Sequence, residues 1–198
     1  MARTRAKDFE EKQHQLLVDA ANVFATEGME KASMAGIAKR AGVSKSLLYH
    51  YYPSKAELIC AIILGHLDDL AAAIEAADDA SLDPRARLEA MVTAVLLAYE
   101  GADDAHKVQL NAAEAMNAEQ QTQVRERTRA IVGRFSAVIE TLLPNLSDEP
   151  RLLTPVTMSL FGMLNWVYTW FREDGGLTRE DYAKVATTMV LDGVKGLR

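Results

Sequence analysis

A tight turn and a short polar helix between Ala41 and Lys55 hold the residue types of this chain best suited to binding an anion. Gly42 supplies the backbone freedom that a sharp turn between two helices requires, and Ser44 is a preferred N-cap residue. The following segment, 45–51, is too short to form a stable helix alone, so neighbouring helices must hold it. Its outer face is then free to contact a ligand.

That outer face combines a cation, a hydroxyl group and aromatic rings, which are the groups that contact phosphates and base edges in a DNA groove. The pattern predicts a helix-turn-helix, in which the second helix enters the groove. The residues of the exposed face are Lys45, Ser46, Tyr49 and His50.

The distribution of charge supports this interpretation, although the whole chain is acidic, with 22 Lys and Arg against 28 Asp and Glu. Residues 1–65 carry 9 basic and 7 acidic side chains, whereas residues 66–198 carry 13 and 21. Five basic residues and no acidic residue lie between Lys31 and Ala56. DNA phosphates would select such a cationic window, and a solvated basic helix pair is the alternative.

Length and composition predict a soluble cytoplasmic protein with one small module and one larger domain. The first fifteen residues are polar and charged, unlike a signal peptide, and no apolar run reaches the ~20 residues that a membrane helix needs. The single cysteine, Cys60, lies in an apolar helical pattern and is expected to be a buried hydrophobic residue.

Helical periodicity predicts an all-α fold of nine helices. Residues 1–53 are expected to form the helix-turn-helix domain, and 54–198 a ligand-binding and dimerisation domain, with helix 54–77 connecting the two. Residues 1–7 are interpreted as a disordered basic arm. The predicted helices span 8–26, 33–41, 45–51, 54–77, 83–100, 103–117, 118–143, 154–173 and 178–196, with Pro144 ending the seventh.

The predicted helix between Pro155 and Phe171 is apolar on nearly all sides. Such a helix must be buried all round, so we expect a second chain to cover its outer side, with Gly162 allowing close approach of the backbones. A central core helix of a monomer is the alternative. A two-fold dimer also suits DNA, because its two recognition helices would read a palindrome.

The first 65 residues resemble the TetR/AcrR family of bacterial transcriptional regulators. Three segments carry the resemblance: Ala20-Ala21 with Phe24 and Glu27-Gly28, Ser33 through Ile37-Ala38, and Ala41 through Lys45 followed by Leu48 through Leu58. The resemblance implies a repressor whose N-terminal domain binds an operator and whose C-terminal domain dimerises and holds an inducer. No cofactor or metal is implied.

The resemblance also implies DNA-contacting roles for particular residues. The start of the recognition helix would contact bases and nearby phosphates. The end of that helix and the start of the next helix would bind phosphates. Three residues depart from the family pattern: Leu47 stands where a small or hydroxyl residue is usual, Met29 replaces an aromatic residue, and Gly36 replaces an acidic residue. The candidate DNA-binding residues are Ser33, Ser44, Lys45, Ser46, Tyr49, His50, Tyr51 and Lys55.

In the C-terminal half, the segment from Gly162 to Leu177 resembles the branch of the family that responds to acyl-CoA thioesters. A small hydrophobic inducer of this kind would occupy a pocket between helices, where methionine adapts to an acyl chain. Arginines 125, 127, 129 and 134 would meet its polyphosphate, unless they form a solvated face. The candidate ligand-binding residues are Met91, Tyr99, Met116, Phe135, Phe161 and Trp166.

Catalysis has little support, because the chain contains no Walker loop, dinucleotide-binding glycine pattern, HExxH, CxxC or GxSxG motif. Glu11 and His14 form one Glu-x-x-His pair, and Asp103 with His106 an Asp analogue, so a di-metal helical bundle is a distant alternative. A DNA-free ligand-binding or adaptor dimer is another alternative, since it would not need the basic window. No catalytic residue is predicted.

Overall fold

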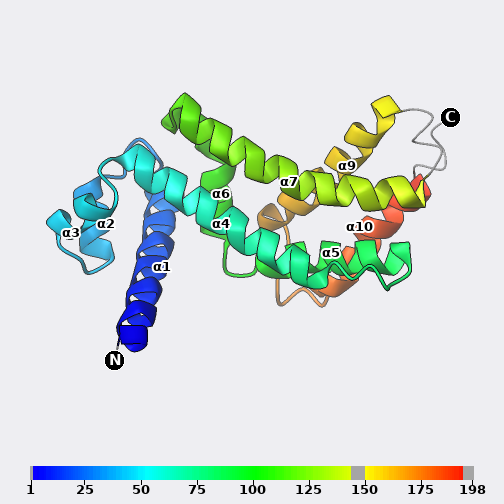
Figure 1. Ribbon diagram of the computed structural model, residues 1–198, viewed down its shortest axis with the longest axis horizontal. Helices are drawn as coiled ribbons and strands as arrows, with labels where there is room; N and C mark the ends of the chain where they lie inside the picture. The colour runs from blue at the N-terminus through cyan, green and yellow to red at the C-terminus, as the bar shows by residue number, and fades with distance from the viewer. Residues whose placement is uncertain (1, 144–149, 194–198) are drawn as a thin grey trace. The chain divides into compact units, whose positions relative to one another are not determined.

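The computed structural model describes residues 2–143 and 150–193, and within these ranges the chain forms nine α-helices and no strand (Figure 1). The predicted all-α class is therefore confirmed. The helices are α1 (Ala2–Glu27), α2 (Met34–Arg40), α3 (Lys45–Tyr51), α4 (Lys55–Ala77), α5 (Pro84–Ala98), α6 (Asp103–Asn111), α7 (Ala118–Leu142), α9 (Pro150–Asn165) and α10 (Arg179–Gly193), with short 3₁₀ turns η1 (Ala113–Ala115) and η2 (Val167–Thr169).

Several helix ends follow from caps that the sequence carries. Ser33, Ser44 and Ser54 each accept a backbone N–H three residues ahead, at 3.1 Å in every case. Asp83 caps α5 in the same way, directly before Pro84 at the first helical position. At the other end of α1, Gly28 adopts a φ of +88°, a conformation that favours glycine.

The N-terminal segment differs from the prediction, because α1 begins at Ala2 rather than near Asp8. Residues 1–7 were expected to be a disordered arm. Alanine, arginine and lysine dominate this stretch and are strong helix formers, so the helix extends backward from its packed part.

Two other boundaries also differ. α6 ends at Asn111 instead of continuing to Asn117, and Asn117 instead starts α7 through reciprocal bonds with Gln120, at 2.9 and 3.0 Å. α9 starts at Pro150, so Pro155 lies inside the helix, and it ends at Asn165 before η2. The predicted stop at Pro144 and the end of the last helix beyond Gly193 lie outside the described residues.

The chain packs as two compact units, residues 1–67 with 101–126, and residues 68–100 with 127–198. In the first unit, α1 packs against α2 and α6, and α2 packs against α3. Its core includes Leu16, Phe24, Ile37, Leu48 and Leu58, all buried. Cys60 is buried there too, as predicted.

In the second unit, α10 packs against α5 and α9. Phe135 of α7 and Phe161 of α9 meet edge to face, with ring centroids 5.0 Å apart. The buried Arg179 fixes the start of α10, since its guanidinium donates to the Leu96 carbonyl at 2.9 Å and lies 4.9 Å from the Phe171 ring. None of the described helices is both long and apolar enough to cross a membrane.

Two buried histidines meet in the core of the first unit. The rings of His66 on α4 and His106 on α6 lie 5.7 Å apart, centroid to centroid. Burial, together with the neighbouring His106, lowers the pKa of His66 to about 4, because a charged imidazole is costly in this environment.

This shift predicts a loss of stability in weak acid. The unfolded chain binds a proton at His66 below pH ~6.5, whereas the folded chain binds it only near pH 4, so the free energy of unfolding should fall across that window by up to about 3 kcal/mol. Urea unfolding between pH 7 and 4 measures this. His66→Gln should flatten the pH dependence, and His14→Gln, at an exposed site on α1, should keep it. An equally steep fall in the His66 variant would contradict the assignment.

Candidate nucleic-acid interface

The turn before α3 is fixed by backbone geometry and one cap. Gly42 has a φ of +64°, which lets the chain reverse after α2, and Val43 N–H donates to the Ala38 carbonyl at 3.0 Å. Ser44 then accepts the Leu47 N–H and starts the seven-residue helix. Leu48 is fully buried and anchors α3 against its neighbours. One side of this short helix is thereby fixed, and the opposite side is presented to solvent.

The structure brings the predicted face of α3 together on the outside of the first unit. Lys45, Ser46, Tyr49 and His50 are all exposed, and Tyr49 retains 41% of its accessible area. The Lys45 ammonium lies 5.7 Å from the centre of the Tyr49 ring, so the cation and the aromatic group form one surface. The two capping serines, Ser33 and Ser44, are exposed at the adjacent helix starts.

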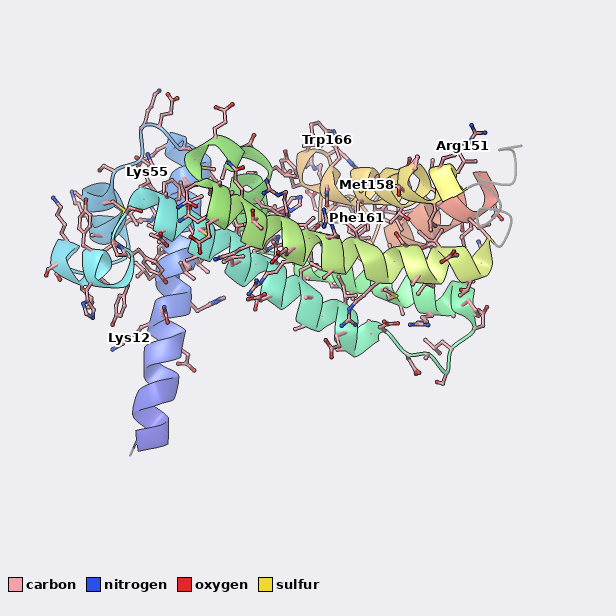
Figure 2. All side chains as sticks on the ribbon, turned by 45° about the horizontal axis from the view of Figure 1, so that its top comes forward. Lys12, Lys55, Arg151, Met158, Phe161 and Trp166 are labelled. Atoms are coloured by element: carbon pink, nitrogen blue, oxygen red, sulfur yellow. The ribbon has the colours of Figure 1, made fainter. Side chains whose placement is uncertain are left out.

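Tyr51 and Lys55 are more enclosed than the rest of the candidate site. The Lys55 ammonium donates to the Glu30 carbonyl at 3.3 Å and lies 5.9 Å from the Phe24 ring. This contact explains why a cation is tolerated in the first turn of α4, where the helix dipole disfavours it. Figure 2 labels Lys55 at the start of that helix.

A groove beside α3 is a feature that the sequence did not reveal. Its volume is about 450 Å³, and it is lined from α1 by Lys12, Gln13, Gln15 and Leu16, from the turn by residues 41–44, and from α3 by Leu47 and Tyr51. The sequence pattern that could have indicated this groove is the four-residue spacing of Lys12 and Leu16, which places a lysine one helical turn before a core residue.

A polar chain also links three helices of the first unit. Arg40 of α2 donates to the Asn22 side-chain oxygen at 3.1 Å, and the Asn22 amide donates to Asp104 of α6 at 2.8 Å. α1 therefore carries a hydrogen-bonded connection between the helix-turn-helix and α6.

The candidate ligand residues separate in the structure. Met91, Tyr99, Phe135 and Phe161 are buried in the second unit, whereas Met116 belongs to the first. Trp166 is 61% exposed and, unlike the other five candidates, is not part of a buried core. The Tyr99 hydroxyl donates to Asn165 at 2.9 Å, and burial raises the pKa of this phenol, which keeps it neutral.

The arginines of α7 favour the solvated-face interpretation over a polyphosphate site. Arg127 pairs with Asp68 at 2.6 Å, and Arg134 reaches Glu75 at 3.2 Å. These guanidinium groups are more than 40% exposed and already have carboxylate partners from α4.

An apolar stripe lies on the outer side of α9 and α10. Met158, Gly162 and Trp166 follow one another at four-residue spacing on α9 and its end, and all three are exposed. Val185 and Met189 form the corresponding exposed pair on α10, at 45% and 60% exposure. Figure 2 labels Met158 and Phe161 on α9 and Trp166 just beyond its end. We call the five exposed residues Met158, Gly162, Trp166, Val185 and Met189 the apolar stripe.

Two family models match the chain. Residues 16–62 match the model described as bacterial regulatory proteins of the tetR family, and residues 81–194 match the tetracyclin repressor-like C-terminal domain. The second match covers more than half of the chain. Among described residues, no group of three or more His, Cys, Asp or Glu side chains is placed to hold a metal ion.

The chain is also similar to individual proteins along nearly all of its length. The transcriptional repressor KstR2 of Rhodococcus jostii is 29% identical over 91% of this chain and 89% of its own length. A TetR-family regulator from Bordetella parapertussis has a TM-score of 0.83 at 29% identity, covering 92% of this chain and 95% of its own. AibR, solved with isovaleryl coenzyme A and operator DNA, has a TM-score of 0.77 at 24% identity, covering 90% and 97%.

Proposed function

The chain belongs to the TetR family of bacterial transcriptional regulators, which bind DNA and are not enzymes, and from this premise we propose that it is a ligand-released repressor. In this proposal a homodimer occupies a palindromic operator, and a small hydrophobic inducer releases it. Residues 1–53 bind DNA, residues 54–198 bind the ligand and the second protomer, and the protein acts on DNA in the cytoplasm. The repressor role is supported by the similarity to KstR2.

The exposed face of α3 is the observation that carries the DNA-binding proposal. It joins Lys45, Ser46, Tyr49 and His50 on one surface, within a window of the chain that has no acidic residue. In this arrangement Ser46 and Tyr49 meet base edges, while Lys45 and the hydroxyl groups of Ser33 and Ser44 meet the backbone. Tyr51 and Lys55 would complete the phosphate contacts at the other end of α3.

The proposal predicts tight, salt-dependent binding to the DNA upstream of the protein's own gene. Fluorescence anisotropy at several salt concentrations should give stronger binding to this duplex than to a scrambled one. Tyr49→Ala should weaken operator binding by roughly 1–3 kcal/mol, because alanine cannot reach the base edge that the tyrosine touches. Leu82→Ala, which changes a side chain of similar exposure before α5, should leave it unchanged. Equal and weak binding to both duplexes would favour the DNA-free adaptor alternative.

The apolar stripe supports the homodimer. Large apolar side chains that remain exposed in a single chain lower the free energy when a partner covers them. Gly162 adds to this argument, since a Cβ at this position would meet no atom within 4 Å, so a second helix can approach the backbone. We infer that α9 and α10 of two protomers form a four-helix bundle across the stripe.

Charge on the stripe should separate the protomers. Met189→Glu places a carboxylate at the more exposed of the two stripe positions on α10, where a partner would bury it without a counter-ion. Sedimentation at micromolar concentration should show a dimer for the wild type and a monomer for this variant, with weakened operator binding. Leu97→Glu, at an exposed position on α5 outside the stripe, should remain dimeric. A dimeric Met189→Glu variant would contradict this interface.

For the inducer we propose an acyl-CoA whose acyl chain packs against the residues around Phe135 and Phe161. AibR, which has a similar fold, was crystallised with isovaleryl coenzyme A and operator DNA. Met91, Tyr99, Phe135 and Phe161 offer the apolar and aromatic surface that such a chain would contact.

A panel of acyl-CoAs tests the inducer. Medium or long acyl-CoAs, or aryl-CoAs, should lower the affinity for operator DNA tenfold to a hundredfold. This change corresponds to a coupling free energy of about 1.4 to 2.8 kcal/mol. Each buried methylene contributes about 0.8 kcal/mol, so one chain is sufficient. Free coenzyme A should release nothing. Release by unrelated hydrophobic drugs, with a flat acyl-CoA panel, would overturn the acyl-CoA proposal and leave the DNA-binding function intact.

A further inference from the structure

The groove beside α3 contains one cation, and this cation comes from α1 rather than from the helix-turn-helix formed by α2 and α3. Lys12 lines the groove from α1, whereas Leu47 and Tyr51 line it from α3. Of the residues lining the groove, Lys12 is the one basic residue, and no carboxylate lines the groove. The groove therefore attracts anions.

The position of Lys12 is fixed by the residues that follow it. Gln13 donates to the Tyr52 hydroxyl at 3.2 Å, and the buried Leu16 lies one turn further along α1. α1 continues without a break on both sides of Lys12, so its backbone is part of a continuous helix rather than a loose arm. The side chain itself is exposed (Figure 2). A rigid backbone with an exposed ammonium group is suited to a fixed external anion.

The residues that α3 contributes to the groove, Leu47 and Tyr51, include no basic or acidic side chain. Leu47 is 38% exposed on α3 and offers no hydrogen bond, so it can make only apolar contact with the DNA beside it. A DNA strand passing α3 carries one phosphate per nucleotide, and a cation for the phosphate alongside this part of the helix must come from elsewhere. Lys12 is the cation that the groove itself provides.

We propose that Lys12 binds a phosphate of the operator backbone next to the recognition helix and so positions α3 from outside the helix-turn-helix. The proposal rests on the proposed entry of α3 into the major groove. Because the contact is to a phosphate, Lys12 contributes to affinity for every sequence and not to the choice of sequence.

The test compares salt dependence among single variants of the full-length protein. Lys12→Ala should weaken binding to operator and scrambled duplexes by the same factor. It should also reduce the slope of log K against log salt by about 0.9 for each phosphate that is no longer neutralised, nearly two per dimer. The penalty should accordingly be roughly tenfold larger at 50 mM than at 200 mM salt. Lys12→Arg should restore the wild-type slope.

Arg129→Ala is the matched control, since it removes one exposed positive charge from α7 in the other compact unit. Its slope should equal that of the wild type. A wild-type slope in Lys12→Ala, or equal reductions in both variants, would overturn the phosphate contact while the proposed function stands. Failure of the wild-type protein to bind its upstream DNA would overturn both. Circular dichroism should show wild-type helicity for Lys12→Ala, and a loss of helicity would assign the residue a structural role instead.

Discussion

The burial of Leu48 is the contact on which the proposed DNA-binding surface depends. α3 has only seven residues, and a helix of two turns is not stable alone in water. Its conformation is therefore imposed by the turn at Gly42, by the Ser44 cap and by packing of Leu48 in the core. This dependence also leaves the opposite side of α3 free of any packing role. The exposed side chains between Lys45 and His50 are available to contact DNA, because Leu48 alone anchors this helix in the core.

α1 connects the helix-turn-helix to α6 within the first unit. It packs on both α2 and α6, and Asn22 joins Arg40 of α2 to Asp104 of α6 by two hydrogen bonds. Each of these bonds involves a charged partner, and such bonds are stronger and more directional than neutral ones. A displacement of α6 must therefore break one of these bonds or move α1 and α2 with it.

The sequence predicted features encoded within a few residues of one another. The cap at Ser44, the short helix 45–51 and the helix starts near Ser33 and Asp83 were all predicted from local patterns, and the structure has each of them. Local patterns were less reliable at helix starts, because α1 and α9 each begin upstream of the predicted first residue, at Ala2 and at Pro150. Pro150 and Pro155 compete for the first helical position, and the upstream one occupies it.

Contacts between distant segments could not be predicted in this way. Lys55 was predicted as a DNA-binding residue from its own segment, but its contact with the Glu30 carbonyl, 25 positions away, was not predicted. The arginines of α7 were candidates for a polyphosphate, but Arg127 and Arg134 meet carboxylates of α4, each 59 positions away. The groove at Lys12 likewise depends on the packing of α1 beside the turn, which no single segment encodes.

The all-round apolar pattern of α9 has a physical explanation in its two faces. Leu160, Phe161 and Leu164 are buried within the protomer, whereas Met158 and Trp166 are exposed on the outer side. If a second protomer covers that outer side, one helix contacts both the interior around Phe135 and the partner. The separation of the two recognition helices, about 34–36 Å for successive major grooves, then depends on the helix that an acyl chain would touch. An inducer can act on DNA binding through this helix only if it binds the two dimer spacings with different affinity.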